Sequence, residues 1–90
     1  MAFSPQFESQ YIREFAAIVR RGTSSAVYSA WIQRIRDACS QIADPNIQKE
    51  AQERITRICN YGFIQIEDPE GSRTGIAEEL EELANFVNQI

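Results

Sequence analysis

The sequence contains no histidine, and its 90 residues include only one tryptophan, one methionine, one lysine and two cysteines. Without an imidazole the chain cannot build a serine or cysteine catalytic triad, a histidine-ligated zinc site or a histidine proton relay. Two cysteines are also too few for a structural zinc site. We therefore expect a protein that is not an enzyme, with no catalytic residues, no metal site and no cofactor.

Long apolar runs are missing as well, because no window approaches the roughly 18 consecutive apolar residues of a membrane-spanning helix. The chain shows neither a disulfide-dense cysteine pattern nor an apolar signal segment, so we expect an intracellular, cytoplasmic protein with no membrane partner. Its composition, 43% hydrophobic and 24% charged, is that of a globular protein. A single domain over residues 1–90 is expected, with little surplus stability at this size.

Charge is unevenly distributed along the chain, whose formal net charge is −4. Residues 1–60 carry eight basic and six acidic side chains, a net of +2, whereas residues 61–90 carry one basic and seven acidic side chains, a net of −6. Affinity for nucleic acids depends on cationic contacts to phosphate. The acidic C-terminal third therefore makes a nucleic-acid partner unfavourable and favours a protein partner.

Capping residues and apolar periodicity predict a mainly α, small four-helix domain. Ser4–Pro5 and Asp44–Pro45 each pair an N-capping side chain with a proline at the first helical position, and Thr23 or Ser24 can cap another helix. The predicted helices cover residues 5–22, 24–42, 45–62 and 76–90. Between them, residues 63–75 are predicted to form a loop or a short β-hairpin.

The apolar faces of these helices predict the core and the state of the two thiols. The residues expected at the centre of the core are Phe7, Tyr11, Phe15, Trp31, Ile35 and Ile55. Helical projection also places Glu8 inside the apolar arc of the first helix, near enough to the N-terminus to interact with the helix dipole. If the second and third helices fold back antiparallel, Cys39 and Cys59 are offset by about 15 Å along the helix axes, too far for a disulfide. We expect two buried, reduced thiols.

The last helix places apolar residues at alternating spacings of four and three from Ile76, which forms a narrow seam. Such a seam either packs on its own domain or completes a homodimer. Arg34 and Arg36 flank the second helix on opposite sides, and arginine suits bidentate contacts to carboxylates. The predicted partner-binding residues are Leu80, Leu83, Val87, Ile90, Arg34 and Arg36.

The segment that ends at Arg73 resembles the recognition helix and wing of winged helix-turn-helix regulators. It holds a helix, a glycine, the apolar run 63–66, the turn 68–71 and then the arginine. This resemblance implies DNA binding, but the would-be wing carries three acidic side chains against one arginine, which opposes contact with phosphate. We therefore predict a small, intracellular, non-catalytic protein–protein interaction or regulatory domain that self-associates and has no small-molecule substrate. The alternative is a winged-helix-like DNA-binding transcriptional regulator.

Overall fold

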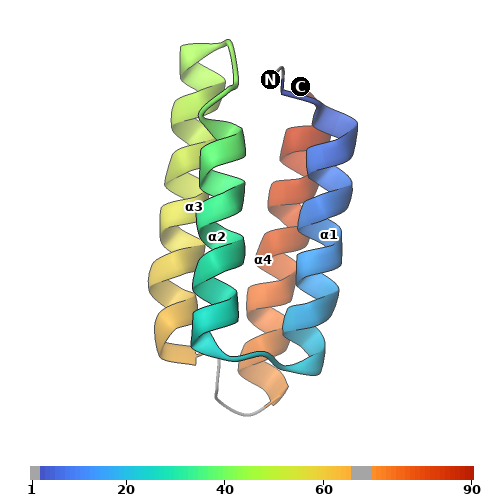
Figure 1. Ribbon diagram of the computed structural model, residues 1–90, viewed down its shortest axis with the longest axis vertical. Coiled ribbons are helices and arrows are strands. Elements are labelled where there is room, and N and C mark those ends of the chain that lie inside the picture. Colours follow the sequence, from blue (N-terminus) through green and yellow to red (C-terminus); the bar gives the residue numbers. More distant parts are fainter. Residues whose placement is uncertain (1–2, 66–69) are drawn as a thin grey trace.

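The computed structural model describes residues 3–65 and 70–90, with side-chain surroundings for residues 3–59 and 74–90. It contains four helices, α1 (Pro5–Arg21), α2 (Ser25–Cys39), α3 (Pro45–Gln65) and α4 (Glu70–Asn88). Successive helices run in opposite directions, so both chain ends lie at the same end of the bundle (Figure 1). The described ranges contain no strand. The predicted fold class, a mainly α four-helix domain, is confirmed.

The helix starts lie where the capping residues predict them. Side-chain oxygens of Ser4, Ser24 and Asp44 each accept a backbone N–H from the first turn of the following helix, over 3.5, 3.3 and 2.8 Å. Such caps satisfy donors that have no partner within the helix. At the other end of α1, Gly22 takes a φ of 98° and its N–H donates to the carbonyl of Val19. A residue without a Cβ adopts this left-handed conformation at little cost.

Each helix lies beside two neighbours, and within the described parts of the chain no close approach of backbones crosses the diagonal of the bundle. The backbones of α1 and α4 approach each other most closely, and those of α1 and α2 least closely. Fully buried alanines on α1 and α4, Ala16, Ala77 and Ala84, allow the two backbones to approach each other. Arg20 of α1 also pairs with Glu81 of α4 over 2.9 Å. The C-terminal acidic helix therefore pairs with an arginine of its own chain.

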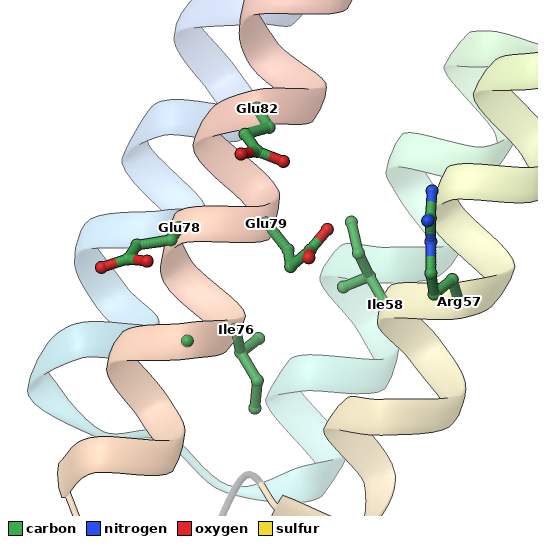
Figure 2. Close-up of a pocket in the computed structure, with 7 residues that line it drawn as sticks. Arg57, Ile58, Ile76, Glu78, Glu79 and Glu82 are labelled. Atoms are coloured by element: carbon green, nitrogen blue, oxygen red, sulfur yellow. The ribbon is translucent and has the colours of Figure 1, made fainter.

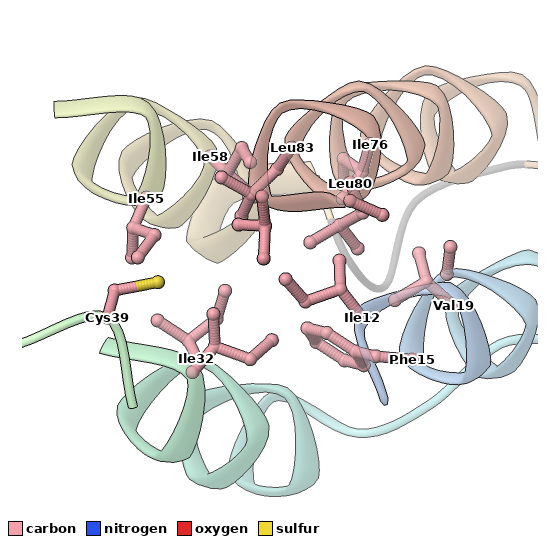
Figure 3. Packing of buried hydrophobic residues seen from close by; sticks show 14 of the residues in the cluster. Ile12, Phe15, Val19, Ile32, Cys39, Ile55, Ile58, Ile76, Leu80 and Leu83 are labelled. Carbon is pink, nitrogen blue, oxygen red and sulfur yellow. The ribbon is translucent and has the colours of Figure 1, made fainter. Parts of the chain in front are cut away.

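The core runs along the axis of the bundle and takes buried side chains from all four helices (Figure 3). Phe15, Ile35 and Ile55, three of the predicted central residues, are buried there. Tyr28 is fully buried too, and its hydroxyl donates to the carbonyl of Ile58 over 2.9 Å, which links α2 to α3. Burial raises the pKa of Tyr28 well above its usual range, so this hydroxyl stays protonated.

Three predicted core residues lie nearer the surface than expected. Tyr11 and Trp31 are only partly buried, and Phe7 is 59% exposed. Each step of four residues along a helix ends about 40° past a full turn, so the stripe through Phe15, Tyr11 and Phe7 drifts out of the core. The prediction that Phe7 lies at the centre of the core is therefore wrong, and its side chain lies on the surface.

Several helix bounds differ from those predicted. α2 ends at Cys39, three residues early, although Ile42 is still buried. α3 continues to Gln65, and α4 begins at Glu70, so both helices extend into the segment predicted as a loop or hairpin. A short apolar run such as 63–66 fits a helix as well as a strand, and packing decides between them. The rest of that segment, residues 66–69, lies outside the described residues.

Candidate functional site

The predicted seam of α4 packs on its own domain. Leu80, Leu83 and Val87 are each at most 1% exposed and belong to the core, whereas Ile90 is 43% exposed. The seam therefore forms the intramolecular contact that the sequence left open as one of its two alternatives. Of these four predicted partner-binding residues, only Ile90 lies on the surface of the chain.

Arg34 and Arg36 lie on opposite sides of α2, as predicted. Arg36 reaches towards α3, where its Nη1 lies 3.4 Å from the hydroxyl of Thr56. Arg34 reaches towards α1 and pairs with Glu8. The structure thus separates the two arginines and brings only Arg34 into contact with the first helix.

Glu8 and Arg34 form a partly buried ion pair. Nη1 of Arg34 donates to both carboxylate oxygens of Glu8, at 2.9 Å for Oε1. Glu8 is only 7% exposed, while the side chain of Arg34 is 38% exposed. The guanidinium also lies over the ring of Tyr11, 4.1 Å from its centroid, and 5.8 Å from the centroid of Phe7. The hydrogen bond with Glu8 raises the pKa of Arg34, and the contacts with Glu8 and with the ring of Tyr11 hold the guanidinium in place.

The sequence places Glu8 in the apolar arc of α1 but does not reveal its partner. Glu8 lies only about 20° around the helix from Phe15, which explains its burial. A carboxylate in such a position needs a cation to offset its lost hydration. The signal for that cation was Arg34 at the edge of the apolar face of α2, but the sequence does not reveal which helix lies next to which edge.

A groove of about 630 Å³ lies beside this ion pair, between the first turns of α1 and the last turns of α2. We call it the α1–α2 groove, and it is lined by Phe3, Ser4, Phe7, Glu8, Arg34, Asp37, Ala38 and Gln41. Phe7 leaves most of its ring open to solvent here, and Phe3 is half-buried. The backbones of α1 and α2 approach each other less closely than those of any other neighbouring pair, and aromatic rings lie between the two helices. The groove therefore combines uncovered aromatic surface with fixed charges.

The charged side chains of the α1–α2 groove keep spare hydrogen-bonding capacity. Arg34 donates only through Nη1, so its Nε and Nη2 have no acceptor in the described ranges. Asp37 accepts from Gln33 through Oδ1 and has no cationic partner among those residues. Both groups can bind a partner without breaking a contact within the chain.

A second, smaller groove of about 360 Å³ lies between α3 and α4 (Figure 2). Ile58 and Ile76, which belong to the core, line it, together with Arg57 and three glutamates, Glu78, Glu79 and Glu82. Glu79 extends across towards α3, and Glu78 points away from it. None of the three glutamates has an ion pair with another described residue. This α3–α4 groove offers acidic side chains but no exposed large apolar residue.

The two cysteines are free thiols, as predicted. Burial, and to a lesser extent the charge of Glu8, raise the pKa of Cys39 to about 11, so it is a thiol rather than a nucleophilic thiolate near neutral pH. Cys59 is only partly buried, less than expected. Where side chains are described, no cluster of acidic or cysteine side chains could hold a metal ion. The helices that the structure describes include none that is long and apolar enough to cross a membrane.

Comparison with known protein families, curated proteins and solved structures finds no match.

Proposed function

We propose that this protein is a small, non-catalytic interaction domain that self-associates through the α1–α2 groove. The observation that carries this proposal is the exposure of Phe7, which is 59% accessible beside the groove. Fully burying such a side chain contributes about 1.5–3 kcal/mol, and more than half of Phe7 remains to be covered. The remaining large apolar residues on the described surface, Val27 and Ile90, are 42% and 43% exposed, and neither lines this groove.

The small area of this interface limits the strength of the association. Stable interfaces bury about 1,200–2,000 Å² in total, and association also costs several kcal/mol in lost freedom of motion. A short groove flanked by one exposed and one partly buried aromatic ring supplies only part of this area. We therefore expect a weak dimer, with a Kd on the order of 100 µM.

The test is the molar mass of the protein across a dilution series, measured by light scattering or sedimentation equilibrium. Phe7→Ser should weaken association by at least about tenfold, because each copy loses the aromatic contact. Val27→Ser is the matched control, since it also exposes a hydroxyl in place of a solvent-exposed apolar side chain but lies at the start of α2, away from the groove. A wild-type monomer at every concentration, or equal effects of the two substitutions, would refute the proposal.

The winged-helix alternative has no observation in its favour. The described residues contain no strand. Of the would-be wing, residues 63–65 belong to α3 and residues 70–73 to α4. On α3, the helix before the would-be wing, Arg54 pairs with Glu50 over 3.2 Å. This pairing reduces the attraction of Arg54 for phosphate. Retention on heparin at low salt, lost steeply as salt rises, would support this alternative instead.

A further inference from the structure

Two opposite charges lie on the face of α2 that lines the α1–α2 groove. Arg34 and Asp37 are three residues apart, so they are neighbours on the helix surface, about 4.5 Å apart along its axis. Ala38, a small residue, lies beside them and is only half-buried. A second helix can therefore approach this face closely.

The arginine of this pair is already fixed in position. Glu8 holds one nitrogen of Arg34, and the ring of Tyr11 lies 4.1 Å below the guanidinium. Its remaining N–H groups have no acceptor among the residues described, and the second carboxylate oxygen of Asp37 has no donor there. Because the cation is ordered before binding, little further side-chain entropy is lost when a carboxylate binds to it.

We propose that the occupant of the α1–α2 groove is a second copy of this chain, docked about a two-fold axis with the two α2 helices antiparallel. This rests on the proposed function, and it names the contact. A two-fold axis that passes between positions 34 and 37 places Arg34 of each copy opposite Asp37 of the other, so the same ion pair forms twice. The same axis brings both exposed Phe7 side chains to the interface. Such a face is complementary to itself, which a surface of one charge sign is not.

The first experiment reverses one charge. Asp37→Arg places two arginines opposite each other at both contacts and should weaken self-association by at least about tenfold. Glu53→Arg is the control, since Glu53 is an exposed residue of α3 whose replacement changes the net charge equally. Asp37→Asn, which keeps the shape of the side chain, should cause a smaller loss, and helical circular dichroism should be unchanged in all three.

The second experiment restores the complementarity. Arg34→Asp is made together with Glu8→Gln, so that no buried carboxylate is left unpaired. This double variant should not self-associate, but mixed with Asp37→Arg it should form a heterodimer, since arginine then faces aspartate at both contacts. Dimerisation that requires the mixture is the expected result.

The outcomes separate this inference from the proposed function. If Phe7→Ser disrupts the dimer while Asp37→Arg behaves like Glu53→Arg, the groove is the interface and the Arg34–Asp37 pairing is wrong. If neither Phe7→Ser nor Asp37→Arg changes the molar mass, or the wild type is a monomer throughout, both the pairing and the proposed function are wrong.

Discussion

Arg34 lies across the boundary between α1 and α2 and donates to both carboxylate oxygens of Glu8 while its guanidinium covers the ring of Tyr11. This single contact has two consequences. It neutralises an acidic side chain that lies among apolar neighbours of α1, and it fixes a cation at the edge of the α1–α2 groove.

Removal of Arg34 should cost more stability than neutralisation of its partner. Arg34→Met leaves Glu8 buried without a cation, and we expect a loss of about 1–3 kcal/mol in the free energy of unfolding. Glu8→Gln leaves only a partly exposed arginine and should cost less than about 1 kcal/mol. Urea denaturation measures both. Equal losses, or a larger loss for Glu8→Gln, would show that Glu8 does not depend on Arg34.

Ser9 is 1% exposed, and its hydroxyl has no hydrogen-bond partner among the described residues. A buried hydroxyl without a partner lowers stability, and alanine is a better helix former. Ser9→Ala should therefore raise the free energy of unfolding by about 1 kcal/mol. Ser4→Ala, which removes the cap of α1, should lower it by about 1 kcal/mol. If Ser9→Ala were destabilising, the hydroxyl would have to be satisfied in the folded protein.

Trp31 should contribute less to stability than Phe15. Trp31 stacks on Tyr11 and Phe15 at centroid distances of 4.6 and 5.2 Å, but it is only partly buried, whereas Phe15 is fully buried. Phe15→Ala should cost about 3–5 kcal/mol, and Trp31→Ala about half of that. Thermal or chemical denaturation of the two variants shows which substitution costs more stability. A larger loss at Trp31 would mean that the surface at α1 and α2 is more tightly closed than in this structure.

Stability should fall as the pH rises above about 9. Burial raises the pKa of Cys39 from 9.0 to about 11. Between these values the unfolded chain loses the thiol proton while the folded chain keeps it, so the free energy of unfolding decreases with pH. Burial of Tyr28 acts in the same direction at higher pH. In Cys39→Ala the free energy of unfolding should decline less between pH 9 and 10. An unchanged decline would mean that other groups cause it.

The helix starts and much of the core could be predicted from the sequence because they depend on local signals. Ser4–Pro5 and Asp44–Pro45 determine where helices begin, and the spacing from Ile76 to Val87 marks a face that is indeed buried. Capping and periodicity act within a few residues of each other in the chain.

The candidate site could not be predicted in the same way because it depends on which helix faces meet. The sequence singled out Arg34 but did not reveal that it meets Glu8, 26 residues earlier in the chain. It also placed Phe7 in the core, because the sequence does not show how far around α1 the neighbouring helices cover the stripe that drifts from Phe15 to Phe7. What covers the α4 seam likewise depends on how the helices pack. In the structure, α4 lies against α1 and α3.

The measurement that tests the α1–α2 groove most directly is a dilution series of amide ¹H–¹⁵N correlation spectra of the wild-type protein. If this groove is the interface, peaks of Phe7, Arg34, Asp37 and Ala38 should shift with concentration, while those of Glu78 and Glu82 in the α3–α4 groove stay in place. Spectra that do not change with concentration, or shifts confined to α4, would contradict this account.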